Sequence, residues 1–153
     1  MAEHELVAAL SVIDLFAGVP AKVIRRIADS GEKEAHAAGA TVISQGSAVG
    51  GFSAFSRPGV GMHVVLEGGA RVVVHGVEHG MLGPGAYFGE LSLIDGEPRS
   101  ADVVAAPGGL VTFAISKWTF ETLLEEHPEV AVPMLHVLCA RLRAQEAAVS
   151  GSH

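Results

Sequence analysis

FGELSLIDGEPRSA, residues Phe88–Ala101, is the segment around which the rest of the chain is organised. Gly89 lets the backbone approach a ligand closely, and a short helical turn after it leaves its first amides free, where the helix dipole favours an anion. Arg99 is the only Lys or Arg over residues 72–116, and its planar guanidinium matches phosphate oxygens. Since a carboxylate repels a phosphate, Glu90 is better suited to accept a hydrogen bond from a sugar hydroxyl.

These residues resemble the phosphate-binding cassette of the cyclic nucleotide-binding domain family, found in catabolite-activator-type bacterial regulators, regulatory subunits of cyclic-AMP-dependent kinase and gated channels. The family pattern is a Phe-Gly-Glu opening, a small residue and Leu, then Pro-Arg-Ser/Thr/Ala-Ala. The residues that match the pattern and its lead-in are Leu82–Gly85, Phe88, Gly89, Glu90, Ser92, Leu93, Pro98, Arg99, Ser100 and Ala101. The resemblance extends from about Leu15 to Leu142.

The resemblance implies a role for each part of the cassette. The cyclic phosphate is expected to contact the side chains or backbone of Arg99, Ser100, Ser92, Leu91 and Ala101. The ribose 2′-hydroxyl is expected to contact Glu90 and Gly89. The implied ligand is cyclic AMP or cyclic GMP, with no cofactor, no catalytic residue and no metal ligand. Ser100 does not distinguish the two bases, and the similarity to bacterial regulators favours cyclic AMP.

Contacts to the base are less clearly marked in the sequence. Val72, Val74 and Met62 are candidates for an apolar wall around ribose and base, and plain sheet core is an equally good interpretation of each. Gln145 lies in the C-terminal segment that caps the base in the family, and it is the candidate polar contact there.

Periodicity along the chain predicts a mainly β fold with flanking helices, an antiparallel jelly-roll β-barrel. Helices are expected in an N-terminal element, 1–30, and in a C-terminal segment, 116–149, where Ser116 caps the first helix and Pro133 bends or restarts the second between residues 129 and 134. The barrel covers 33–115 in short strands, expected at 41–43, 62–66, 70–75, 101–105 and 110–115. These elements predict a single domain over 1–149. Residues 151–153 resemble the remnant of an expression tag, and whether the native chain continues beyond them is left open.

Composition excludes several classes of protein. A net charge of −7 argues against a broad nucleic-acid surface, and no apolar run reaches the length of a membrane span. With no N-terminal signal either, the sequence predicts a cytoplasmic protein. The single Cys139 is expected to be a small core residue.

Two segments depart from the family. The connection at 47–61 is longer than usual and carries Phe52 and Phe55, which indicate either a docking surface or lid, or aromatics folded back on the sheet. The hairpin Val74–Leu82 is shorter than usual and brings His75 and His79 near His63 and Glu67 in sequence. Those four residues are a weak signal for a cupin-type metal site.

The function predicted is a regulatory module that binds a cyclic nucleotide, is not an enzyme and relays the signal by movement of its last helix to an unidentified effector protein or missing effector domain. No helix-turn-helix follows, so neither DNA nor membrane binding is expected of this chain alone. Leu135, Leu138 and Leu142 suit a homodimer seam along the last helix, and equally suit packing on the barrel. The alternatives are a degenerate domain that acts by protein contact, whose pocket is filled by its own side chains, and the cupin-type metal-binding enzyme.

Overall fold

The computed structural model of the chain describes residues 3–47 and 60–150. Its strands form one six-stranded sheet in the order β1-β6-β3-β4, with β2 on β6 and β5 on β3, and every pair is antiparallel. The strands are β1 Glu32–His36, β2 Thr41–Ile43, β3 Val60–Val74, β4 Val77–Leu82, β5 Tyr87–Phe88 and β6 Asp102–Ser116. The predicted fold class is confirmed, although the sheet does not close into a barrel over the described residues. Most of the 47–61 connection, with Phe52 and Phe55, lies outside those residues.

The centre of the sheet is a pair of long strands, β3 and β6, where the sequence predicts four short ones. The glycines that suggest breaks lie instead at register shifts inside continuous strands. A Cβ at Gly68 would lie 2.2 Å from the carbonyl oxygen of Gly109, so only glycine lets the two backbones approach this closely. These shifts bend the sheet without ending its strands.

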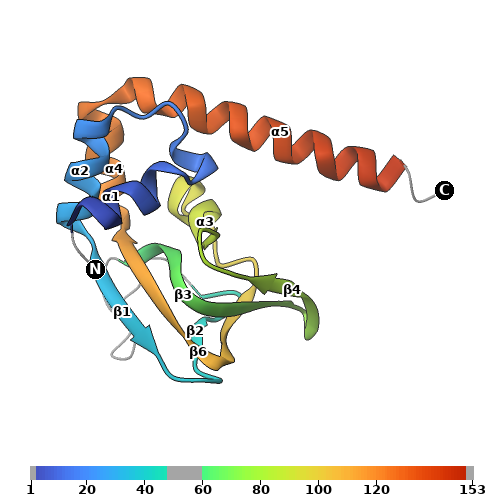
Figure 1. Ribbon diagram of the computed structural model, residues 1–153. Coiled ribbons are helices and arrows are strands. Elements are labelled where there is room, and N and C mark those ends of the chain that lie inside the picture. Colours follow the sequence, from blue (N-terminus) through green and yellow to red (C-terminus); the bar gives the residue numbers. More distant parts are fainter. Residues whose placement is uncertain (1–2, 48–59, 151–153) are drawn as a thin grey trace.

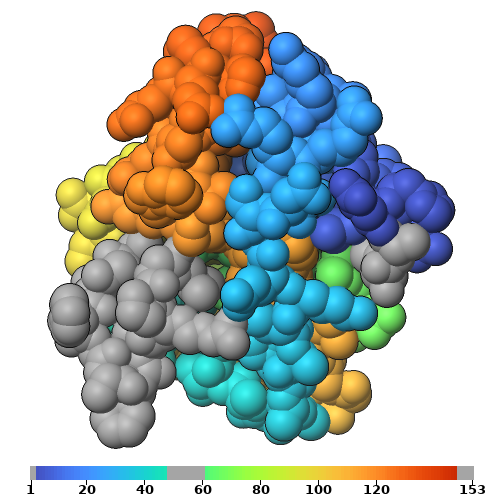
Figure 2. Space-filling model, turned by 90° about the vertical axis from the view of Figure 1, so that its left-hand side faces the viewer, coloured from blue at the N-terminus to red at the C-terminus, as the bar shows by residue number. Residues whose placement is uncertain are grey.

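Helices from both ends of the chain gather at one end of the sheet (Figure 1). The helical elements there are α1 Glu3–Ser11, the 3₁₀ turn η1 Asp14–Phe16, α2 Ala21–Ser30, α4 Lys117–Glu126 and the 3₁₀ turn η2 Pro128–Val130, and α5 Ala131–Ser150 leads away from them. Figure 2 shows α2 (blue) and α4 (orange) side by side, and Arg26 of α2 lies 2.6 Å from Glu126 of α4. None of the helices in the described part of the chain is long and apolar enough to cross a membrane.

Two apolar clusters lie on opposite faces of the sheet, because successive residues of a strand point to opposite sides. The first joins the sheet to the helices and includes Phe16, Ile24, Phe113, Ile115 and Phe120. The second cluster consists of Ile43, Val65, Ala70, Phe88, Val103, Ala105 and Leu110. This second face carries the pocket described below.

The helix α5 extends away from the body of the domain (Figure 1). It begins at Ala131, within the predicted interval of 129–134, so Pro133 lies in the first turn, where its missing amide interrupts no helical hydrogen bond. Leu135 and Leu142 are exposed on it. Cys139 is also exposed, and the prediction that it is a core residue is wrong because this helix does not lie on the sheet.

Candidate ligand-binding site

The cassette is a strand, a short helix and a loop joined by two glycines. β5 ends at Phe88, Gly89 turns the chain with φ 87°, and α3, Glu90–Asp95, follows at once. Gly96, with φ 73°, ends α3, and the loop then reaches Arg99 before β6 begins. Both glycines adopt the left-handed conformation that other residues avoid, and this reverses the chain twice within ten residues.

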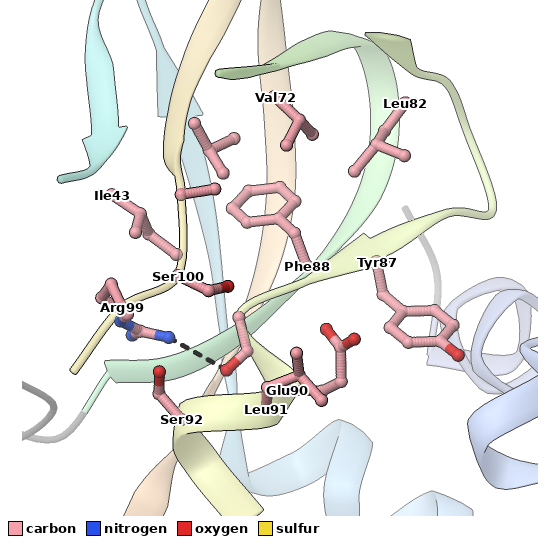
Figure 3. Close-up of a pocket in the computed structure, with 13 residues that line it drawn as sticks. Ile43, Val72, Leu82, Tyr87, Phe88, Glu90, Leu91, Ser92, Arg99 and Ser100 are labelled. Carbon is pink, nitrogen blue, oxygen red and sulfur yellow. Dashed lines mark hydrogen bonds between the residues drawn. The ribbon is translucent and has the colours of Figure 1, made fainter. Parts of the chain in front are cut away.

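Arg99 lies beneath the start of α3. Its side chain is buried, with 8% of the residue exposed, and its Nη1 donates to the carbonyl oxygen of Gly89 at 2.9 Å (Figure 3). Two backbone hydrogen bonds, from Arg99 to Ser47 and from Gly46 to Arg99, fix the loop. Burial lowers the pKa of Arg99, and the Glu90 carboxylate acts in the opposite direction. A buried guanidinium held this way is suited to an anionic ligand, because an anion offsets its lost hydration.

Glu90 joins the cassette to the C-terminal helix. It is 9% exposed, and its Oε1 accepts a hydrogen bond from Arg141 Nη1 of α5 at 3.1 Å. Arg141 also lies 4.6 Å above the ring of Tyr87 and reaches Asp14 Oδ1 at 3.4 Å, and the Tyr87 hydroxyl donates to the same Asp14 oxygen. Burial raises the pKa of Glu90; its backbone hydrogen bond opposes this shift, Asp14 adds to it and Arg99 opposes it.

A cavity of about 180 Å³ opens above these two side chains. Arg99, Ser92 and Glu90 lie at one end, and apolar side chains surround the other (Figure 3). The cavity is lined by Ile43, Val72, Leu82, Tyr87, Phe88, Gly89, Glu90, Leu91, Ser92, Arg99, Ser100, Ala101 and Val103. One polar end and one apolar end suit a ligand with a charged group and an aromatic or aliphatic body.

The structure brings together the seven cassette residues predicted to contact phosphate or ribose, and Val72 with them. Three residues predicted to contact the base do not line the cavity. Met62 is fully buried in the cluster between the sheet and the helices, which agrees with the sheet-core interpretation of this residue. Val74 is not among the lining residues, and Gln145 is exposed on α5.

Several lining residues were missed by the sequence reasoning. Ile43, Leu82 and Val103 come from strands far apart in sequence, and only the pairing of those strands places them on one face. Phe88 opens the motif and Tyr87 directly precedes it, but neither was predicted to line the pocket. Arg141 is not predicted to take part in the site, because nothing local in the sequence marks a contact that spans 51 residues.

Similarity to known proteins shows which family this chain belongs to. The sequence profile of the cyclic nucleotide-binding domain matches residues 33–127. The chain belongs to the cyclic nucleotide-binding domain family. Over 76 residues, 49% of this chain, it is 43% identical to a cyclic nucleotide-gated potassium channel of Mesorhizobium japonicum and covers 20% of that protein.

Two solved structures support the same family. The domain matches the regulatory domain of Toxoplasma gondii PKA, crystallised with cAMP, with a TM-score of 0.71 and 26% identity over 91% of this chain and 49% of the other. It matches the catabolite activator protein of Thermus thermophilus with a TM-score of 0.72 and 25% identity over 90% of this chain and 62% of the other. The domain thus spans about a fifth of the channel and about half to two thirds of these structures.

The four residues considered for a metal site do not come together. His75 and His79 are exposed on the β3–β4 hairpin, and His75 contacts Gln45 there. Glu67 is exposed, whereas His63 is buried in a different cluster, with Glu34 and His36. Burial, then the nearby charges of His36 and Arg99, lower the pKa of His63 to about 3, so its ring is neutral at pH 7.

Proposed function

We propose that this domain is a regulatory, non-catalytic sensor that binds a cyclic nucleotide in the cassette pocket. Arg99 and the amides at the start of α3 hold the cyclic phosphate, with hydrogen bonds from Ser92 and Ser100. Glu90 and the backbone of Gly89 hold the ribose 2′-hydroxyl. The apolar end of the cavity takes the base. The regulatory character of the family supports the absence of catalysis.

One observation carries this proposal. A buried Arg99 and a buried Glu90 line the same cavity, 180 Å³ in volume, at the start of a short helix. The two charges suit different parts of one ligand, because the guanidinium attracts the phosphate and the carboxylate accepts from a hydroxyl. An isolated phosphate offers no hydroxyl group in the position of Glu90, so the pair favours a nucleotide over a simple anion.

The identity of the base is the finer part of the proposal. We favour cyclic AMP over cyclic GMP, and this preference rests on the resemblance to bacterial regulators and on the cAMP bound in the Toxoplasma relative. Ser100 lines the cavity and is compatible with either base.

The helix α5 is the proposed output of the sensor. Arg141 links α5 directly to Glu90, the residue assigned to the ribose. A ligand that takes part of the hydrogen-bonding capacity of Glu90 changes the strength of this link and therefore the preferred position of α5. An effector protein, a further domain or a second copy of the chain then responds, and the exposed Leu135 and Leu142 are available on α5 for such a contact.

Calorimetric titration with cyclic AMP and cyclic GMP tests the proposal. The wild-type domain is expected to bind one equivalent of nucleotide, cyclic AMP more tightly. Arg99→Ala is expected to weaken binding by about 2–5 kcal/mol, the scale of losing one partner of a buried charge pair. Arg25→Ala is the matched control, since Arg25 is exposed on α2 and its loss is expected to leave affinity unchanged.

Two results would contradict the proposal. A folded domain that binds neither nucleotide is not a sensor, and equal losses in both arginine variants would show a general charge effect. A degenerate domain that acts by protein contact alone would have a pocket filled by the chain's own side chains. The open cavity between the described residues argues against this alternative.

A further inference from the structure

A second group of ligand-type side chains lies on the sheet, outside the nucleotide pocket. Glu34 and His36 project from β1, and His63 projects from β3. β6 runs between these two strands and places Thr112 opposite Glu34. The carboxylate and imidazole atoms of the three residues all lie within 4.8 Å of one another.

The distances within this group are longer than hydrogen bonds. Glu34 Oε2 lies 3.6 Å from His36 Nε2 and 3.9 Å from His63 Nδ1. A hydrogen bond between such atoms is about 2.7–3.2 Å long. A tetrahedral zinc ion with ligands at about 2.0–2.1 Å separates neighbouring ligand atoms by about 3.3 Å. The two distances from the carboxylate are therefore about 0.3 and 0.6 Å longer than the edge of a zinc tetrahedron, and a small movement of the side chains closes the site around an ion.

Packing holds both rings in this orientation. The ring of His63 stacks on Phe88, with centroids 5.0 Å apart, and meets the edge of the His36 ring at 5.9 Å. Thr112 Oγ1 contacts His63 Nδ1 at 2.9 Å and His36 Nε2 at 3.2 Å, so the nitrogen atoms nearest the carboxylate converge on one point. Side-chain exposures of 12% for Glu34, 17% for His36 and 3% for His63 leave an entry on the Glu34–His36 side.

We propose that Glu34, His36 and His63 form a binding site for a single divalent ion of the zinc type. Two imidazoles and one carboxylate make a three-ligand set that suits zinc, with the fourth position left to water or another small ligand. The Thr112 hydroxyl contacts these same two nitrogens in the structure, so it gives them up to the ion and turns away when the metal binds. The competing interpretation is a polar network centred on Thr112 that binds no metal.

Metal titration of the chain, produced without a histidine tag and treated with chelator, separates these interpretations. ZnCl₂ titrated by calorimetry is expected to bind with one equivalent at the site, and cobalt(II) is expected to give the visible absorption of a tetrahedral complex. His36→Ala and Glu34→Gln are each expected to weaken zinc binding at least 10- to 100-fold, the loss caused by removing even an outer-shell partner. His63 is left intact because its substitution endangers the core.

Control variants guard against adventitious binding by the eight histidines of the chain. His79→Ala removes an exposed histidine outside the cluster and is expected to retain the full zinc affinity. Thermal melting checks that each variant is folded. If His36→Ala does not fold, Glu34→Gln alone still tests the proposal. A wild-type chain that binds no zinc, or binding that both cluster variants retain, overturns the proposal. Loss of binding in His79→Ala equal to that in His36→Ala overturns it as well.

Discussion

Arg141 Nη1 lies 3.1 Å from Glu90 Oε1, and this contact joins the protruding helix α5 to the first residue of α3. Glu90 is almost fully buried, whereas the Arg141 side chain is 38% exposed. The pair therefore connects the interior of the cassette pocket with the long terminal helix. Asp14 and Tyr87 complete the surroundings of Arg141 and bring the N-terminal segment into the same group.

Arg141→Ala is expected to uncouple α5 from the pocket. Loss of this hydrogen bond to a charged group is expected to lower the free energy of unfolding by about 1.5–3 kcal/mol. The exposed Cys139, the single cysteine of the chain, accepts a spin label, and Val77→Cys on the exposed hairpin accepts a second. In the otherwise wild-type domain, saturating nucleotide is expected to shift the distance between the labels. In Arg141→Ala this shift is expected to be lost, whereas Arg143→Ala, an exposed arginine on the same helix, keeps it. An unchanged shift in Arg141→Ala would exclude this residue from the relay.

Glu90→Gln is expected to alter the pH dependence of stability. The folded pKa of Glu90 is raised above its ordinary value of 4.5 by burial, so between 4.5 and the folded value the native state binds more protons than the unfolded one. The contribution of Glu90 to stability is thus fully present below pH 4.5 and is lost as the pH rises through the folded pKa. In urea unfolding from pH 4 to 7, the free energy of unfolding of the wild type is expected to rise relative to that of Glu90→Gln as the pH falls. A constant difference would mean that the pKa is not raised.

Gly89→Ala tests the entry to α3. A Cβ there would lie 2.7 Å from the carbonyl oxygen of Gly61 and 2.8 Å from Arg99 Nη1, at a φ of +87°. Gly96→Ala is a matched control, because Gly96 has a φ of +73° with nothing within 4 Å of the added atom. The free energy of unfolding of Gly96→Ala is expected to fall by about 1 kcal/mol from backbone strain alone.

Gly89→Ala is expected to lose at least about 1 kcal/mol more than the control, together with nucleotide affinity, because the clash displaces the Arg99 guanidinium. Denaturant unfolding and calorimetry measure the two effects. Equal losses of stability and unchanged affinity in both variants would contradict the assignment of Gly89.

Ser116→Ala is expected to cost about 1 kcal/mol of stability, the usual loss for an N-cap. Ser116 Oγ accepts a hydrogen bond from the amide of Thr119 at 3.0 Å and so satisfies one of the free donors of α4. Ser11→Ala is the comparison, since the Ser11 hydroxyl only donates to a carbonyl of its own helix and is exposed. Thermal unfolding that affects both variants alike would refute the capping role.

The cassette was predictable because its chemistry is local. Gly89, Glu90 and Arg99 lie within eleven residues, and one turn of helix with a reversal at each end brings them together. The Ser116 cap and the restart of the helix near Pro133 are local for the same reason. Each of these features depends on φ preferences and near neighbours, which the sequence displays directly.

The errors lie where contacts are distant. Both faces of β3 are buried from Met62 to Val65, so alternation of apolar residues does not tell which face Met62 joins. The β-strand breaks expected at glycines were absent because the glycines of β3 and β6 face one another across the sheet. The grouping of Glu34, His36 and His63 depends on β6 pairing with both β1 and β3, which no short motif records.

The outer part of α5 differs in local stability from the part that reaches Glu90. Every side chain from Leu142 to Ala147 is exposed, so beyond Arg141 this stretch is sustained by its own backbone hydrogen bonds. An isolated helix of a few turns is marginal in water, and its amides exchange with solvent through frequent local opening. Amides before Arg141 belong to a helix anchored at Met134 and at Glu90, and they open only when that anchorage is broken. One helix therefore contains two regimes of hydrogen exchange, and the boundary between them lies at the residue that contacts the pocket.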